Sequence, residues 1–298
     1  MPNTLDEKDW QLLLSRIKDG ECTPFLGAGA CFGALPLGRD VALKWAREEN
    51  YPLEDSGDLA KVAQFLAVEY DPMFPKKKIR EEFENAVPPD FTAPDELHGI
   101  LADLPLPLYI TTNYDDFLVQ ALKSRHRDPK REICRWNKFL QRKFPVSAIE
   151  SACPPTPANP LVFHLHGHIE IKESLVLTED DYLDFLRNIS EDPKLLPARI
   201  EEAFSGTSLL FLGYSIADWD LRVIFRSLVS YLERSIGRAH ISVQLMPIRG
   251  EDSEDFRVKL KNAQKYLDDY YGKLAIRMYW GTCQEFAAEL RRRWEAFK

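Results

Sequence analysis

No two cysteines in this chain are close enough in sequence to form a CxxC pair. The five cysteines are Cys22, Cys31, Cys134, Cys153 and Cys283. Their spacing argues against a four-cysteine zinc knuckle. An odd and scattered set of cysteines is typical of a reducing compartment, so we expect a cytoplasmic protein.

The chain also lacks long apolar runs, internal repeats and low-complexity segments. No run approaches the roughly 20 apolar residues that a membrane span needs. The N-terminal stretch MPNTLDEKDW is acidic and polar, unlike a signal peptide. We therefore expect no contact with a membrane.

The chain has fewer positively charged than negatively charged side chains. The chain has 39 Lys and Arg against 47 Asp and Glu, a net charge of −8, which gives no global reason to bind nucleic acid. The exception is residues 123–143, which carry nine Lys or Arg and only two acids. This basic segment is either a contact surface or a solvated face.

What is present is a pattern of apolar strands alternating with amphipathic helices. Strand-like segments are CTPFL, ITTN, LVFHLHG, SLVLT, TSLLFLGYS, HISVQLMP and LAIRMYWG. Helical patterns cover roughly 5–18, 37–50, 57–70, 76–86, 94–103, 178–204, 252–269 and the C-terminus, where Phe286, Leu290, Trp294 and Phe297 form one apolar stripe.

This alternation predicts an α/β fold with a mostly parallel sheet covered on both faces. At 298 residues we expect one domain over residues 1–298, with a Rossmann-like, doubly wound sheet. Helical insertions are expected near 34–104 and 124–160, the second because it is basic and then rich in proline.

Four of the strand-like segments end in residues suited to ligand binding. In FLGAGA, Gly27, Ala28 and Gly29 follow a buried strand, and the glycines would let backbone amides approach a phosphate. The third glycine of a dinucleotide fingerprint is absent, since position 32 is Phe. A tight turn without a ligand is the alternative.

The second segment, YITTNYDDFL, ends in an amide and two acids. Asn113 and Asp115 follow Thr112 directly before an apolar helical pattern. Helix capping would explain one of these polar residues, because Asn and Asp are preferred caps. It does not require all of them.

The third segment, VFHLHGHIE, contains alternating His164, His166 and His168. On a strand the three side chains would point to one face, and such an array can hold zinc. Gly167 suggests that the strand ends there, which would leave His166 at its tip.

The fourth segment, FLGYSIADWD, repeats the first pattern with Gly213, Ser215 and then Asp218 at the start of a helix. Helix capping is again the alternative reading. Ligands bind outside the carboxyl ends of strands in doubly wound sheets, so the four ends are expected to face one crevice.

Taken together and in order, these motifs resemble those of the Sir2-like (sirtuin) family. GAGA at 27–30, TTNYD at 111–115, LHG at 165–167 and GYS at 213–215 are similar to its successive motifs. The pairing of LTEDDY with GYSIADWDLR resembles the family's bacterial anti-phage defence branch of NAD-cleaving enzymes.

The resemblance implies a role for each matched residue. Asn113 would bind the nicotinamide ribose and position water, Asp115 would hold the nicotinamide carboxamide, and His166 would act as general base near its ordinary pKa. The implied cofactor-binding residues are Gly27, Ala28, Gly29, Thr112, Gly213, Ser215 and Asp218.

Departures from the family pattern bear on acyl-lysine chemistry. GALPLGRD stands where deacylases have GIPDFR, Thr112 replaces a Gln, and the F-G-E-x-L-P substrate segment is missing. The four zinc cysteines are also missing, so no zinc-ribbon subdomain and no metal are expected. The resemblance therefore implies hydrolysis of NAD+ to nicotinamide and ADP-ribose, in antiviral defence by NAD depletion.

Such an enzyme needs control. The resemblance implies a homo-oligomer and a separate sensor or activator, such as a HerA-type ATPase or a nucleotide-sensing partner. The alternatives are an NAD-dependent protein deacylase, a non-catalytic NAD or ADP-ribose binding module, and a metallohydrolase built on His164, His166 and His168.

Overall fold

The computed structural model describes residues 5–147, 154–214, 239–246, 253–273 and 275–297. In these residues the core is a seven-stranded sheet of order β3-β4-β2-β1-β5-β6-β7. Every neighbouring pair is parallel. The strands are β1 Cys22–Leu26, β2 Leu108–Thr111, β3 Lys130–Ile133, β4 Leu161–His164, β5 Ser208–Leu212, β6 His240–Gln244 and β7 Ile276–Trp280. The predicted parallel, doubly wound α/β fold is confirmed.

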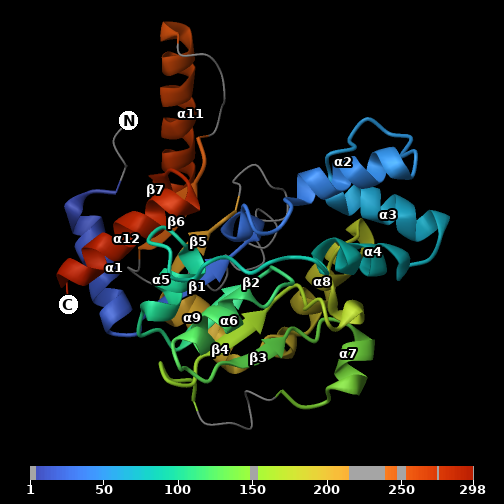
Figure 1. The fold of residues 1–298 in the computed structure, drawn as a ribbon, viewed down its shortest axis with the longest axis horizontal. Helices are drawn as coiled ribbons and strands as arrows, with labels where there is room; N and C mark the ends of the chain where they lie inside the picture. Colours follow the sequence, from blue (N-terminus) through green and yellow to red (C-terminus); the bar gives the residue numbers. More distant parts are fainter. Residues whose placement is uncertain (1–4, 148–153, 215–238, 247–252, 274, 298) are drawn as a thin grey trace.

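Helices cover both faces of the sheet (Figure 1). Leu26 points to the face covered by α1 (Glu7–Lys18), α5 (Leu97–Asp103), α6 (Phe117–Ser124) and α12 (Cys283–Phe297). Its neighbour Phe25 points to the opposite face, with α7 (Lys138–Lys143), α8 (Glu179–Glu191), α9 (Ala198–Gly206) and the end of α11 (Glu254–Gly272). This alternation explains why the strands read as continuous apolar runs.

Three further helices form a layer of their own beside the sheet. They are α2 (Gly38–Glu48), α3 (Leu59–Glu69) and α4 (Phe74–Phe83), and they lie together at one side of the molecule, next to α8 (Figure 1). Trp45, Leu66 and Ile79 are buried among them. These helices occupy most of the expected insertion at 34–104, while α5 belongs to the main layer.

The second expected insertion, 124–160, needs correction in part. Lys130–Ile133 forms β3, an edge strand paired with β4, where helical insertion was expected. Lys130 and Arg131 are partly or fully exposed while Ile133 is buried. The charged residues of β3 do not fit the apolar pattern by which the other strands were predicted, and such charges are common on edge strands.

Two other expectations also differ from the structure. The segment SLVLT, residues 174–178, is not a strand: its Ser174 ends the short 3-10 helix η2 (Lys172–Ser174), and Leu175 and Leu177 lie in irregular chain that packs into the α2–α4 layer. The single helix expected over 178–204 is broken into α8 and α9 by η3 (Pro193–Leu195), because proline cannot continue a helix. No helix in the described residues is long and apolar enough to cross a membrane.

The predicted stripe of the last helix is confirmed for three residues. Phe286, Leu290 and Trp294 of α12 are buried, and Phe297 is partly buried. The Trp10 and Phe286 rings stack with centroids 5.5 Å apart, which joins α12 to α1.

Candidate active site

The carboxyl ends of β1 and β5 form the switch point of the sheet. The chain passes from β1 to β2 on one side and later returns to β5 on the other. The two turns that follow these strands touch: the Gly27 amide donates to the Leu212 carbonyl and the Gly29 amide to the Gly213 carbonyl, both at 2.8 Å. These amides are therefore engaged within the protein, while Ala28 between them is exposed. Ligands of doubly wound sheets bind at such a point.

Two of the glycines are required by this contact. Gly213 has φ +76°, and a Cβ there would lie 2.1 Å from the backbone nitrogen of Ala30. A Cβ on Gly29 would lie 2.9 Å from the Gly213 Cα. No L side chain fits between the turns without moving their backbones.

We expect Gly213→Ala to lower the free energy of unfolding by about 2 kcal/mol, from the left-handed φ and the backbone clash. Chemical denaturation measures the loss. The control is Gly206→Ala at the end of α9, where a Cβ meets nothing within 4 Å. That variant should be as stable as the wild type, and equal stabilities of the two variants would contradict the close contact.

Tyr214 covers the β1 turn. Its ring lies 2.8 Å from where a Cβ on Gly27 would be. Its hydroxyl donates to the Leu26 carbonyl at 2.9 Å and lies 2.8 Å from Thr112 Oγ1. Thr112 thus holds Tyr214, a residue that sequence reasoning did not single out. Ser215 and Asp218 lie outside the described residues.

Asn113 connects the end of β2 to the β1 turn. Its half-buried amide Nδ2 donates to the Gly27 carbonyl at 3.0 Å and to Cys31 Sγ at 3.2 Å. Asp115 precedes Asp116, the N-cap residue of α6, and its Oδ1 accepts from the first helical amide, that of Phe117, at 2.9 Å. Its Oδ2 also accepts from Cys31 Sγ at 3.2 Å, so capping accounts for only part of its contacts.

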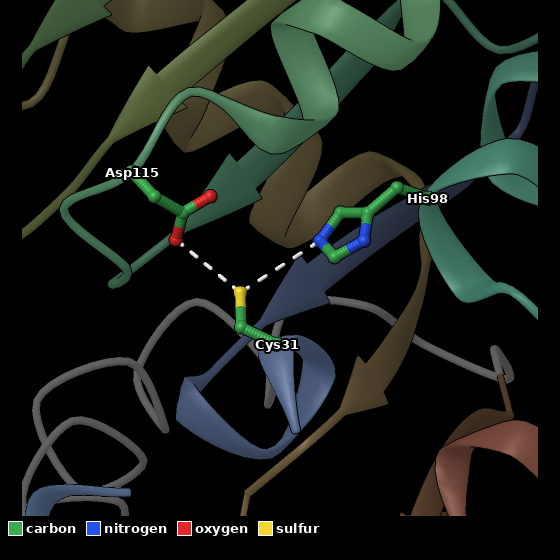
Figure 2. A group of neighbouring side chains, drawn as sticks. All are labelled: Cys31, His98 and Asp115. Carbon is green, nitrogen blue, oxygen red and sulfur yellow. Dashed lines mark hydrogen bonds between the residues drawn. The ribbon is translucent and has the colours of Figure 1, made fainter. Parts of the chain in front are cut away.

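A buried group behind Asn113 was missed by sequence reasoning. Cys31 lies between Asp115 and His98, with Sγ 3.8 Å from His98 Nε2 (Figure 2). His98 Nδ1 is 2.8 Å from Glu96 Oε1. Burial raises the pKa of the Cys31 thiol well above its usual value, and the negative charge of Asp115 raises it further. The thiol is therefore protonated at neutral pH and is a poor nucleophile.

The three histidines do not share one face, so the alternative of a three-histidine array on one strand is wrong, and β4 ends two residues before the expected tip at His166. β4 ends at His164, so His166 and His168 follow a turn. His168 Nε2 lies 3.2 Å from Asp116 Oδ1 and 3.0 Å from the Arg131 guanidinium, which also binds Asp116 Oδ2 at 2.7 Å. His164 packs edge-on against His168. Arg131 supplies the positive charge there, which disfavours a metal on His164, His168 and Asp116.

His166 lies apart from that pair, against α8. Its ring contacts Tyr182 and Phe185, with centroids 5.4 and 5.0 Å away. Its Nε2 is buried without a hydrogen-bond partner in the described part of the chain. Burial lowers the pKa of His166 to about 3. The expectation of a histidine at an open strand tip, near its ordinary pKa, is therefore wrong for this conformation.

The buried histidines make stability depend on pH. Burial also lowers the pKa of His164 to about 3. Above pH 7 both rings are neutral in the folded and unfolded chain. Below that, only the unfolded chain takes up the protons, so stability falls as pH falls. From pH 7.5 to 5.5 we expect a loss of about 2–3 kcal/mol, roughly 1.4 kcal/mol per histidine.

Urea denaturation at pH 7.5 and 5.5 measures this loss. In His166→Phe, which replaces the ring by one that cannot titrate, the loss should fall by about half. An unchanged loss in that variant would contradict the burial of a neutral His166.

The model of the SIR2-like domain family matches residues 107–270. The chain is 28% identical over 231 residues to "NAD(+) hydrolase ThsA" of Bacillus cereus (strain MSX-D12), covering 75% of this chain and 43% of that protein. It is 25% identical over 277 residues to "NAD(+) hydrolase ThsA" of Acinetobacter baumannii (strain 532279), covering 88% and 52%. The chain thus spans about half the length of these curated relatives.

A solved structure described as "Structural Basis for the Mechanism and Regulation of Sir2 Enzymes" is similar at 12% identity, with a TM-score of 0.43 and coverage of 98% of this chain and 99% of that chain. The SIR2-like domain match covers more than half of the sequence, and this chain therefore belongs to the SIR2-like domain family.

Proposed function

We propose that the protein hydrolyses NAD+ to nicotinamide and ADP-ribose at the switch point of its sheet. The observation that carries the proposal is the contact between the Asn113 amide and the Gly27 carbonyl, at 3.0 Å. It brings together the two motifs that the family resemblance assigns to the nicotinamide ribose and to the cofactor turn. The curated relatives named NAD(+) hydrolase support this activity.

For NAD+ cleavage, the protein has mainly to position the substrate and a water molecule. Cleavage passes through an oxocarbenium-like state, and nicotinamide leaves as a neutral pyridine. Asn113 would orient the ribose and a water, and Asp115 would hold the carboxamide. Gly27, Ala28, Gly29 and Gly213 would line the cofactor, together with Thr112, Ser215 and Asp218. No metal is required for these steps.

His166 would act as general base once its cover moves. Tyr182 and Phe185 of α8 pack against the His166 ring, so α8 must shift before the ring can contact a ribose. Exposure would return its pKa toward the ordinary value near 6.5, suitable for a base at neutral pH. The start of α8 is held by the buried Lys76, whose Nζ lies 2.8 Å from Asp181 Oδ1.

Activity of this kind has to be controlled, because unregulated NAD+ loss harms the host cell. We propose a cytoplasmic effector of antiviral defence that depletes NAD+, acts as a homo-oligomer and is activated by a separate sensor, such as a HerA-type ATPase or a nucleotide-sensing protein. The basic segment 123–143 is the candidate contact surface. Its Arg131 binds Asp116 next to Asn113 and Asp115, so a partner there could move the catalytic turn.

The test is product analysis after incubation with NAD+, with and without candidate activators. We expect nicotinamide and ADP-ribose in equal amounts, with no need for a peptide. A deacylase would release nicotinamide only with an acyl-lysine peptide and would form O-acyl-ADP-ribose. A binding module would be stabilised by NAD+ and release nothing. Either result would overturn the proposal.

A further inference from the structure

We propose that Cys31, His98 and Asp115 form a binding site for Zn²⁺, with Glu96 supporting the histidine. Nothing in the proposed NAD+ chemistry uses His98 or Glu96, and no sequence motif predicted the group. Its donors come from three separate places: the end of η1 (Ala28–Cys31), the start of α5, and the loop between β2 and α6.

The donor atoms already have nearly the spacing of a tetrahedral zinc site. One atom each from Cys31, His98 and Asp115 lies within 4.8 Å of the other two (Figure 2). Cys31 Sγ is 3.2 Å from Asp115 Oδ2 and 3.8 Å from His98 Nε2. Zinc bonds of about 2.3 Å to sulfur and 2.0–2.1 Å to nitrogen or oxygen, at tetrahedral angles, separate the donors by about 3.5 Å. Rotation of side chains is enough to close the site.

Glu96 sets the orientation of the histidine. Its Oε1 lies 2.8 Å from His98 Nδ1, which leaves Nε2 directed at Cys31. The same carboxylate accepts from the backbone amides of His98 and Gly99 and caps α5. A carboxylate on the far nitrogen of a histidine is the usual support for a zinc ligand.

The donor set selects the metal. One sulfur, one imidazole and one carboxylate suit Zn²⁺ better than Mg²⁺ or Ca²⁺, which take oxygen donors. When zinc binds, the proton that Cys31 now donates to Asp115 leaves to solvent as the metal–sulfur bond forms. Three protein ligands leave a fourth position for water or an added ligand.

The cluster differs in one respect from the group of His164, His168 and Asp116. There the Arg131 guanidinium contacts two of the three residues. In the described part of the chain, no Lys or Arg forms an ion pair with Cys31, His98 or Asp115. A divalent cation would therefore meet no repulsion from a paired side chain.

Zinc would also affect the proposed reaction. The metal would bind the Asp115 carboxylate, which in the proposed function holds the nicotinamide carboxamide. It would also bind Cys31 Sγ, which Asn113 Nδ2 contacts at 3.2 Å. We infer that bound zinc inhibits NAD+ cleavage. This consequence rests on the proposed function, whereas metal binding does not.

The experiment is zinc titration of the metal-free full chain against a chromophoric chelator, without NAD+. We expect one zinc per chain, and the Co²⁺-substituted protein should show a thiolate-to-metal absorption band. Cys31→Ala and His98→Ala should each weaken binding by at least about 100-fold, and Glu96→Gln by about 10-fold. The matched control is Cys22→Ala, a buried cysteine at the opposite end of β1, which should bind as the wild type does.

Absence of zinc binding by the wild type, or a cobalt complex without a thiolate band, would overturn the site whether or not the variants fold. So would wild-type affinity in Cys31→Ala. A second arm measures NAD+ cleavage with and without added zinc. Inhibition of the wild type, relieved by chelation, supports the coupling. Cleavage unaffected by a saturating amount of bound zinc refutes it, and a protein that binds zinc but never cleaves NAD+ refutes only the proposed function.

Discussion

Replacing Leu290 with Asp is expected to lower the free energy of unfolding by at least about 4 kcal/mol. Leu290 is fully buried on α12, in the core cluster that joins α12 to α1 and to the sheet. Removing the leucine side chain from such a site costs about 2–5 kcal/mol, and the carboxylate adds its own cost of burial. Thermal and urea denaturation would measure the loss.

The control for this variant is Ala288→Asp. Ala288 is exposed on the same helix, two residues away, so the same acid is introduced without burial. Its effect should stay within about 1 kcal/mol. If the two variants were equally stable, the burial of the apolar stripe of α12 would be refuted.

Asn113→Ala is expected to lower the rate of NAD+ cleavage by about 10³-fold. Its amide Nδ2 extends from the end of β2 to the β1 turn, where it contacts the Gly27 carbonyl and Cys31 Sγ. Loss of a positioned polar group of this kind costs about 10²–10³ in rate, because the transition state loses its orientation and charge stabilisation. His166→Ala should abolish turnover as well, since the base would be missing.

The comparison variant is Asn137→Ala. Asn137 caps α7 through the Leu140 amide at 2.9 Å, and its Nδ2 donates to the Glu173 carbonyl rather than to a residue of the proposed site. It should lose about 1 kcal/mol of stability and keep its rate. Near wild-type turnover in Asn113→Ala or His166→Ala, measured under activating conditions, would show that the reaction takes place elsewhere.

The sheet could be predicted from the sequence because its strands carry local information. Buried parallel strands such as β1 and β5 are largely apolar, and a glycine follows each of them directly. The edge strand β3 begins with Lys130 and Arg131, so the same criterion missed it. SLVLT has the composition of a strand, but Leu175 and Leu177 pack into a helical layer whose position no local pattern encodes.

The candidate site was predictable only in part, for a similar reason. Asn113 and Gly27 each stand at the end of a strand, so the topology alone brings them together. The pairing of Cys31 with His98 joins residues 67 positions apart and depends on how α5 packs. Phe185 of α8 packs on His166, and the spacing of the three histidines in the sequence carries no information about where α8 packs.

We propose that NAD+ binds and is cleaved at the switch point between β1, β2 and β5. The most direct test is an experimental structure of Asn113→Ala, which should bind NAD+ without cleaving it, soaked with NAD+. We predict the pyrophosphate beside Gly27, Ala28 and Gly213 and the nicotinamide ribose within reach of residues 113 and 166, with Tyr182 and Phe185 displaced. NAD+ bound elsewhere on the protein, with the β1, β2 and β5 turns unchanged, would show that the switch point is not the NAD+ site.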